Sequence, residues 1–355
     1  MPIAPRNAMS RADTPWLCAD GAVTGVGSLP FPATEPALEF IARWCPQVPF
    51  WPQLRRMSPR EAMLPQTFGA HMRHLTPLRG EYSFGISADR ASRFFDAIEK
   101  GDAAFDPSHA AGFFAFVEAS RQGAFAGARA VKGQMMGPVT TACSLVSDGT
   151  AFIDHPGFRP AIADYIVRLA RWQVDALLAC SPAVILVLDE AYLGMALRQN
   201  PLRRDAIVEV LRSVILRVRR PGVLVGIHCC DEIPTAVLCE IEADLFSFDA
   251  HHGGAVFAAD PDARSFVDAG GYLAWGWVPT LDDLAGVHAD AIVERWQSAV
   301  ATLAGAESGA ADRIAARSLI TASCGLAGSS PATCERSFQI AREVSEGFAR
   351  SAPIT

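Results

Sequence analysis

The stretch Gly222-Val223-Leu224-Val225-Gly226-Ile227-His228-Cys229-Cys230 indicates the fold of this chain more strongly than any other. A continuous run of apolar residues and glycine is followed directly by an imidazole and two thiols. Such a run is typical of a strand that is covered on both faces, as in a parallel sheet. The polar triplet falls where this strand would end, and parallel α/β barrels place their chemistry at that edge.

Two further apolar runs lead to metal-binding side chains, since Cys324 follows the run 319–322 and Asp249 follows the run 245–248. Imidazole, thiolate and carboxylate are the groups that bind zinc in proteins. His228 and Cys230 are two residues apart and can point to one side, while Cys229 points away into the barrel wall. We therefore predict a Zn²⁺ site formed by His228, Cys230, Asp249 and Cys324.

The rest of the chain repeats the same unit, an apolar run followed by an amphipathic stretch. We predict strands over 22–26, 128–135, 184–188, 222–227, 245–248, 272–275 and 318–322, and helices over 35–44, 160–180, 202–218, 233–241, 256–269, 281–303 and 331–348. Repeated strand–helix units imply a parallel sheet with right-handed crossovers. We predict an α/β fold, namely one (β/α)8 TIM barrel over 20–350, after a short disordered tail at 1–19. The stretch 46–79, rich in Pro, Met and Arg, is expected to form a long loop over the site.

The composition limits the possible partners. The chain has 355 residues, with 31 Lys and Arg against 38 Asp and Glu, so that the net charge is -7. With no basic stripe in the sequence, this balance argues against nucleic acid and against an anionic membrane surface. No apolar stretch reaches the ~20 residues that span a bilayer, and the first residues lack the apolar core of an export signal. The expected location is the cytoplasm, and the odd number of cysteines does not suggest a disulfide framework.

Five segments of the chain, in order, resemble the catalytic domain of cobalamin-independent methionine synthase. These segments are Thr24–Pro30, Lys132–Thr140, Val187–Glu190, His228-x-Cys230 and Ser323–Leu326. The similarity runs from about residue 20 to residue 348. It also fits the wider group that contains uroporphyrinogen decarboxylase and the corrinoid-linked thiol methyltransferases.

The resemblance implies an enzyme that binds a thiol, homocysteine in the first place, as a zinc-bound thiolate and methylates it to methionine. His228, Cys230 and Cys324 fall on the family's zinc ligands, whereas Asp249 stands where the synthases have Glu. A zinc-bound thiol is deprotonated, although a free thiol with a pKa near ~8.5 is mostly protonated at neutral pH.

The resemblance also assigns residues to the amino-acid part of the substrate. Asp189 falls on a carboxylate that binds the amino group of homocysteine. Gly27 and Ser28 fall on the backbone segment that holds its carboxylate, and Glu61 on a second carboxylate facing the amino group. The expected partners are therefore a small-molecule thiol and a methyl donor.

Two departures from the family concern the donor. We expect no room for the extra half that holds polyglutamate folate in the synthases, so the methyl group could come from a methylfolate or from a methyl-corrinoid, carried or not by a corrinoid protein. The family's proton-donating His is absent from 275–279; His251 or His252 could replace it, although we favour polar loop residues. Trp275 and Trp277 either form an apolar wall for the donor or seal the core.

Two alternatives remain open at this point. A decarboxylase of the uroporphyrinogen type would need arginines for substrate carboxylates, and Arg55, Arg56, Arg60, Arg73 and Arg79 are candidates. Such an enzyme has no use for three soft metal ligands, which disfavours it. The second alternative is a barrel that binds zinc or a thiol without turnover, against which the retention of Asp189 and Ser28 argues.

Overall fold

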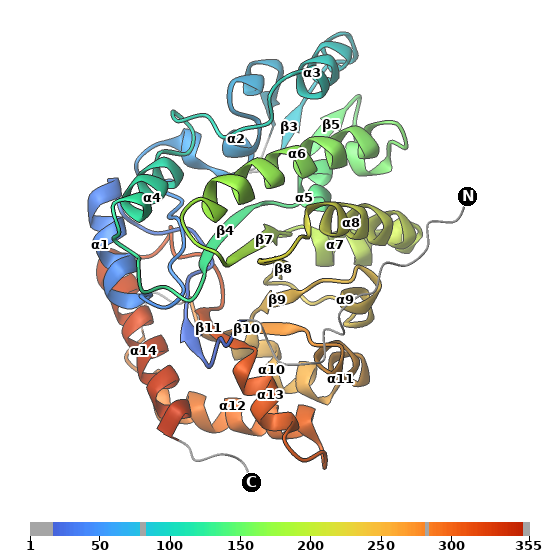
Figure 1. Cartoon of the computed structure of the whole chain (residues 1–355). Coiled ribbons are helices and arrows are strands. Elements are labelled where there is room, and N and C mark those ends of the chain that lie inside the picture. Colours follow the sequence, from blue (N-terminus) through green and yellow to red (C-terminus); the bar gives the residue numbers. More distant parts are fainter. Residues whose placement is uncertain (1–16, 79–82, 281–283, 351–355) are drawn as a thin grey trace.

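A curled sheet of seven parallel strands forms the centre of the protein, seen in a computed structural model that describes residues 17–78, 83–280 and 284–350 (Figure 1). The strands lie in the order β1-β11-β10-β9-β8-β7-β4. Their bounds are β1 Ala22–Val23, β4 Val131–Met136, β7 Val184–Asp189, β8 Val223–Cys229, β9 Leu245–Phe248, β10 Tyr272–Val278 and β11 Ser318–Ala322. Each of these strands is buried at every position, which explains why the sequence reads as continuous apolar runs.

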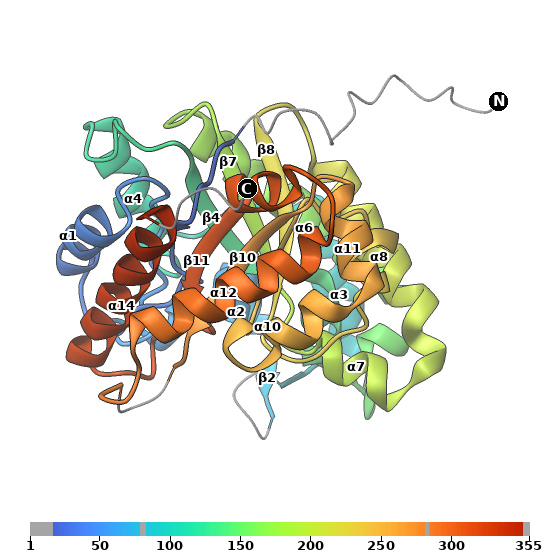
Figure 2. The same cartoon turned by 90° about the horizontal axis from the view of Figure 1, so that it is seen from below.

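Helices follow the strands and cover the outside of the sheet, as Figures 1 and 2 show from two directions. The longer helices along the chain are α1 Thr34–Trp44, α3 Ala88–Lys100, α4 Ala111–Arg121, α6 Phe158–Leu178, α8 Arg204–Val218, α10 Ala250–Ala259, α11 Pro261–Asp268, α12 Ala289–Ala304 and α14 Pro331–Arg350. The shorter ones are α2 Met63–Phe68, α5 Pro138–Ser144, α7 Leu193–Gln199, α9 Ala236–Glu240 and α13 Ala310–Ala316, with 3-10 turns at Pro59–Glu61, Gly69–His74, Phe152–Asp154 and Pro201–Arg203. This alternation of strand and helix is that of a TIM-like barrel.

The predicted closure into eight regular strands is wrong, because β1 and β4 are the two edges of the sheet. An irregular segment, residues 47–53, lies between these edges. It makes isolated parallel bridges, Phe50 to Lys132 on the β4 side and Gln53 to Ser28 beyond β1. Prolines at 49 and 52 lack the N–H group that a regular ladder needs, which accounts for the irregular pairing.

The stretch 46–79 is more structured than the long loop that we predicted. Besides the segment 47–53 it contains α2 and two 3-10 turns, and it ends in β2 Thr76–Pro77. A second, four-stranded sheet has the order β2-β3-β5-β6, with β3 at Phe84–Gly85, β5 at Leu145–Ser147 and β6 at Thr150–Ala151. The sequence analysis predicted neither this small sheet nor the helices α3, α4 and α5.

Two predicted boundaries also differ from the structure. The helix expected over 256–269 is two helices, α10 and α11, which meet at Asp260, the residue before Pro261. The residue before a proline is biased away from helical geometry, and Asp260 is extended. Leu17 and Ala19, at the end of the predicted tail, are buried, and Ala19 donates its N–H group to the carbonyl oxygen of Ala316 at 2.7 Å. Most of the predicted tail, residues 1–16, lies outside the described residues, as do 79–82, 281–283 and 351–355.

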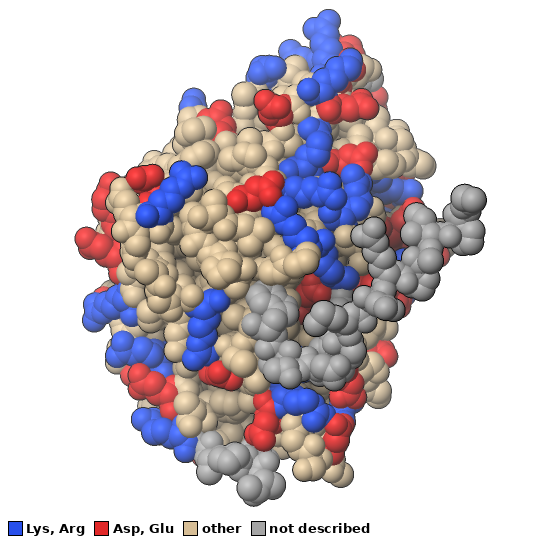
Figure 3. All heavy atoms as spheres, viewed as in Figure 1, with Lys and Arg blue, Asp and Glu red and all other residues tan. Residues whose placement is uncertain are grey.

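Charged side chains of both signs lie on the surface shown in Figure 3, where several Lys and Arg side chains gather in the upper centre with acidic groups beside them. Arginines near α6 and α8 pair with acidic side chains, as Arg217 does with Asp164 and Arg220 with Asp175. Among the described residues, no helix combines the length and the apolar character that crossing a membrane requires.

Candidate metal and thiol site

The end of β8 places His228 inside the curled sheet. Its Nδ1 atom lies 2.9 Å from the hydroxyl oxygen of Ser247, the residue beside it on β9. Its Nε2 atom is buried and has no hydrogen-bond partner in the described structure. A buried ring nitrogen without a partner costs free energy, whereas a His that binds a metal through Nε2 often bonds to a neighbour through Nδ1.

Cys229 and Cys230 point in different directions, as the sequence predicted for consecutive residues at a strand end. The thiol of Cys229 donates to the carbonyl oxygen of Asp231 at 3.4 Å, and burial raises the pKa of this thiol to about 12. Cys229 therefore behaves as a packing residue. Cys230 instead faces the inside of the curled sheet, on the same side as His228.

Cys324 follows strand β11, which is separated from β8 by β9 and β10 in the sheet, and it completes a three-residue group. It lies two residues after the end of β11, and one ligand atom each of His228, Cys230 and Cys324 lies within 4.8 Å of the others. This is the only group of that kind found in the described part of the chain. The hydrogen bond from the Cys324 thiol and the neighbouring His228 lower the pKa of Cys230. The same hydrogen bond, together with burial, raises the pKa of Cys324.

The donor set of this group fits zinc. Two thiols and an imidazole are ligands that zinc accepts in tetrahedral sites, and soft thiolates disfavour magnesium or calcium. The orphaned Nε2 atom of His228 is explained if a cation occupies the space between the three side chains. The predicted ligands His228, Cys230 and Cys324 are thus brought together, and their binding of zinc stays a prediction.

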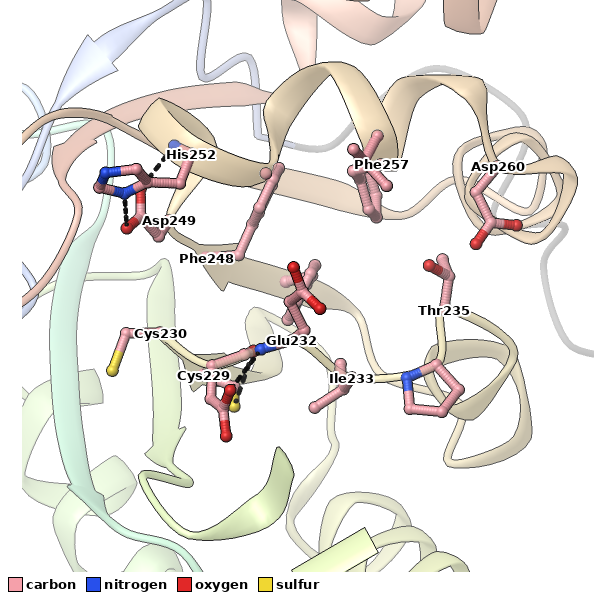
Figure 4. A pocket seen from close by; sticks show the side chains of 15 residues that line it. Cys229, Cys230, Glu232, Ile233, Thr235, Phe248, Asp249, His252, Phe257 and Asp260 are labelled. Carbon is pink, nitrogen blue, oxygen red and sulfur yellow. Dashed lines mark hydrogen bonds and ion pairs between the residues drawn. The ribbon is translucent and has the colours of Figure 1, made fainter. Parts of the chain in front are cut away.

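Asp249, the predicted fourth ligand, lies outside this group. Its side chain caps α10: one carboxylate oxygen accepts from the backbone N–H of His252 at 3.1 Å, and the other lies 2.7 Å from the Nδ1 atom of that residue. Figure 4 shows Asp249 and His252 on the wall of a second cavity, of about 220 Å³. The sulfur of Cys230 in the same view is directed away from Asp249. Both oxygens of Asp249 therefore have other partners.

A cavity of about 310 Å³ adjoins the three-residue group. Its lining includes every predicted site residue except Gly27 and Asp249, and the lining residues that matter here are Ser28, Gln53, Glu61, Asp189, His228, Cys230 and Cys324. Gly27 does not line the cavity, and a Cβ atom at this position would come within 2.8 Å of the Gln134 side chain. The cavity is at the lower end of the range, roughly 300–1,000 Å³, of small-molecule sites.

Asp189 lies at the end of β7, in register with His228 on β8. Its Oδ1 atom is buried and has no hydrogen-bond partner in the described structure. Burial raises the pKa of this carboxyl to about 6; the nearby His228 and Lys132 oppose the shift and Cys230 adds to it. A buried acceptor at a cavity wall with no partner is suited to a ligand that donates a hydrogen bond or carries a positive charge.

Glu61 reaches the same cavity from the end of the 3-10 turn Pro59–Glu61, just before α2. One of its oxygens accepts from the backbone N–H of Ala111, the first residue of α4, at 2.5 Å. The other accepts from the side-chain amide of Gln66 at 3.0 Å. Burial raises the pKa of Glu61, and the hydrogen bonds from Ala111, Leu54 and Gln66 work against that increase.

Several residues that the sequence analysis missed also shape this site. Glu190, next to Asp189, accepts hydrogen bonds from the backbone N–H groups of Val139 and Thr140 at the start of α5, and burial raises its pKa to about 7. Lys132 is buried in β4, where its Nζ atom donates to the carbonyl oxygen of Val26 at 2.8 Å. A polar residue inside an apolar strand was the signal that could have singled out Lys132.

Most of the other candidate residues do not line this cavity. Trp275 and Trp277 are fully buried and stack with ring centroids 5.7 Å apart, so they seal the packing between sheet and helices. His251 and His252 lie in α10, not in a loop as predicted. Of the four described arginines considered for a decarboxylase, only Arg55 lines the cavity; the fifth, Arg79, lies outside the described residues.

Comparison with known proteins gives similarities to solved structures. No protein-family model and no curated protein matches the sequence. Among solved structures, the chain is similar to a B12-independent methionine synthase from Shewanella sp. W3-18-1, determined in complex with selenomethionine, at a TM-score of 0.48 and 15% identity. The alignment covers 66% of this chain and 66% of that one.

Proposed function

We propose that this protein is a zinc-dependent thiol methyltransferase whose acceptor is homocysteine. The observation that carries the proposal is the convergence of His228, Cys230 and Cys324 on the wall of a cavity that also contains Asp189 and Glu61. Soft metal ligands suit a thiol, and two buried carboxylates suit its amino group.

The three ligand residues leave one position of a tetrahedral zinc site for a substrate. A zinc ion held by these three residues would supply the positive charge that favours the deprotonated form of a thiol bound at that position. Ser247 fixes the imidazole ring of His228 through Nδ1, which leaves the unpaired Nε2 atom as the one that would hold a cation. Asp249 is the weaker candidate for the remaining position, because its oxygens cap α10 and bind His252.

The other end of the cavity would hold the amino-acid part of the acceptor. The unpaired Oδ1 atom of Asp189 accepts a hydrogen bond from an ammonium group, and Glu61 contributes the second negative charge. Ser28 faces the cavity beside Gly325 and is placed to donate to a carboxylate. Holding both ends orients the sulfur toward the donor, which is the proximity contribution to catalysis.

The methyl donor is proposed to be a methylfolate or a methyl-corrinoid. A cavity of about 310 Å³ accommodates an amino acid but not either donor in full, so the donor would present its methyl group at the mouth.

The direct test is to incubate zinc-loaded protein with homocysteine and either methyltetrahydrofolate or methylcobalamin, and to measure methionine by mass spectrometry. We expect methionine with one of the donors and none with the Cys324→Ser variant. Zinc binding and thiol binding without methionine from either donor would instead favour a barrel that binds a thiol without turnover.

A further inference from the structure

A chain of buried side-chain amides ends on the Glu61 carboxylate. The side-chain amide of Gln53 donates to the side-chain oxygen of Gln66 at 2.9 Å, and the amide of Gln66 donates to Glu61 at 3.0 Å. All three side chains are buried, with Gln53 at 5%, Gln66 at 2% and Glu61 at 1% exposure. Both donors point toward the carboxylate, an arrangement that suits its ionised form because an ionised carboxylate only accepts.

The other end of this chain is attached to the backbone on both sides of Ser28. The backbone N–H of Gln53 donates to the carbonyl oxygen of Gly27 at 3.0 Å, and its carbonyl oxygen accepts from Leu29 at 3.1 Å. The residue between these two, Ser28, lines the cavity. One hydrogen-bonded path therefore connects the segment proposed to hold the substrate's carboxylate with the group proposed to hold its amine.

We propose that Gln66 is a positioning residue that fixes the Glu61 carboxylate at the cavity wall and so makes the site select thiols that carry an amino group. The proposal rests on the proposed function. A carboxylate can accept about four hydrogen bonds, so its protein donors leave capacity for a ligand N–H group. Without Gln66 the carboxylate keeps its backbone donors Ala111 and Leu54 but loses the buried side-chain donor on its second oxygen, and with it the orientation that this donor fixes.

The test compares two buried glutamines. Gln66→Met keeps the side-chain length and removes both hydrogen bonds. Gln173→Met is the matched control, because Gln173 is also fully buried and hydrogen-bonded, to Trp51 at 2.9 Å and to the carbonyl oxygen of Gln134 at 3.4 Å, yet it does not line the cavity. Each zinc-loaded variant is titrated calorimetrically with homocysteine and with 4-mercaptobutyrate, which lacks the amino group.

We expect Gln66→Met to weaken homocysteine binding about tenfold, as expected for a lost hydrogen bond to a charged group. Binding of 4-mercaptobutyrate should change less than about twofold, and Gln173→Met should leave the ratio of the two affinities unchanged. In a Glu61→Gln background, Gln66→Met should have no further selective effect, because Gln66 acts through Glu61. If Gln66→Met does not fold, Gln66→Asn removes the same contact by shortening the side chain.

Equal loss for both thiols, no loss for either, or a selective loss that persists in the Glu61→Gln background would each overturn the role of Gln66. These outcomes differ from failure of the proposed function. In that case the zinc-loaded wild-type protein would itself bind neither thiol, and the inference would fall with it.

Discussion

Asp249 differs from His228, Cys230 and Cys324 in what its side chain already binds. The three form one group, whereas Asp249 caps α10 and pairs with His252. We therefore expect His228→Ala and Cys324→Ser to lose bound zinc and Asp249→Asn to keep about one equivalent, since Asn is also a good helix cap. Metal analysis of the purified variants by mass spectrometry checks this, and zinc loss in Asp249→Asn would restore Asp249 as the fourth ligand.

Asp189 offers a second test at the scale of a single side chain. Its Oδ1 atom is buried without a partner, and the proposed partner is the ammonium group of the substrate. Asp189→Asn keeps the shape and removes the charge, so homocysteine binding should weaken by about ten- to a hundredfold while simple alkyl thiols bind as before. Calorimetry with homocysteine and with propanethiol makes the comparison, and an equal effect on both ligands would exclude an amine-binding role.

Among the elements, strand β4 carries the least expected side chain of the sheet. Lys132 is buried in this strand, and burial lowers its pKa to about 8, against the opposing influence of Asp189 and Cys45. Between pH 8 and about 10.5 the unfolded chain keeps this proton and the folded protein has lost it, so this lysine makes folding more favourable as pH rises. Below pH 8 both states are protonated and the contribution is flat.

The Lys132→Met variant removes this pH-dependent contribution. The free energy of unfolding of the wild-type protein, relative to the variant, should rise between pH 8 and 10 by up to about 1.4 kcal/mol per pH unit. Urea denaturation at several pH values measures the difference, in which the contributions of titratable groups that do not interact with Lys132 cancel. A difference that is independent of pH would show that Lys132 keeps its ordinary pKa in the folded protein.

The loop after β11 depends on a close approach at Gly325. A Cβ atom at this position would come within 2.2 Å of the Ser28 hydroxyl oxygen, and the next residue, Leu326, donates its N–H to the carbonyl oxygen of Ser28 at 3.0 Å. Gly325→Ala should therefore displace Ser28 and weaken homocysteine binding about tenfold, with a smaller effect on zinc. Gly127→Ala, where a Cβ atom meets nothing within 4 Å and which does not line the cavity, is the control. Unchanged binding in Gly325→Ala would show that the loop adapts.

The elements that the sequence predicted well are those whose local pattern agrees with their final environment. Strands β7 and β8 are buried on both faces and read as apolar runs, so they were found to within two residues. The segment 47–53 was missed because its prolines interrupt the pattern and its partners, β4 and the residues after β1, are distant in sequence. His228, Cys230 and Cys324 could be predicted because polar groups follow apolar runs. The roles of Lys132 and Gln66 could not, because they depend on which chain segments become neighbours.

At the scale of the whole molecule, the proposed ion would connect parts of the chain that are nearly a hundred residues apart. His228 and Cys230 end β8, Cys324 follows β11, and strands β9 and β10 lie between them in the sheet. The unfolded chain does not hold these side chains together. Zinc binding should therefore favour the folded state by RT ln(1 + [Zn]/Kd), which is about 4 kcal/mol when free zinc exceeds Kd a thousandfold.

Removing zinc should accordingly lower the melting temperature. In a chain of this size roughly 1–2 °C accompanies each kcal/mol, so a strong chelator should lower Tm by roughly 5 °C, and added zinc should restore it. The Cys324→Ser variant should melt near the temperature of the zinc-free protein with or without chelator, because its group of ligands is incomplete. Calorimetric melting of both proteins provides the measurement. A wild-type Tm unaffected by removal of its zinc would mean that the ion does not link β8 to the loop after β11.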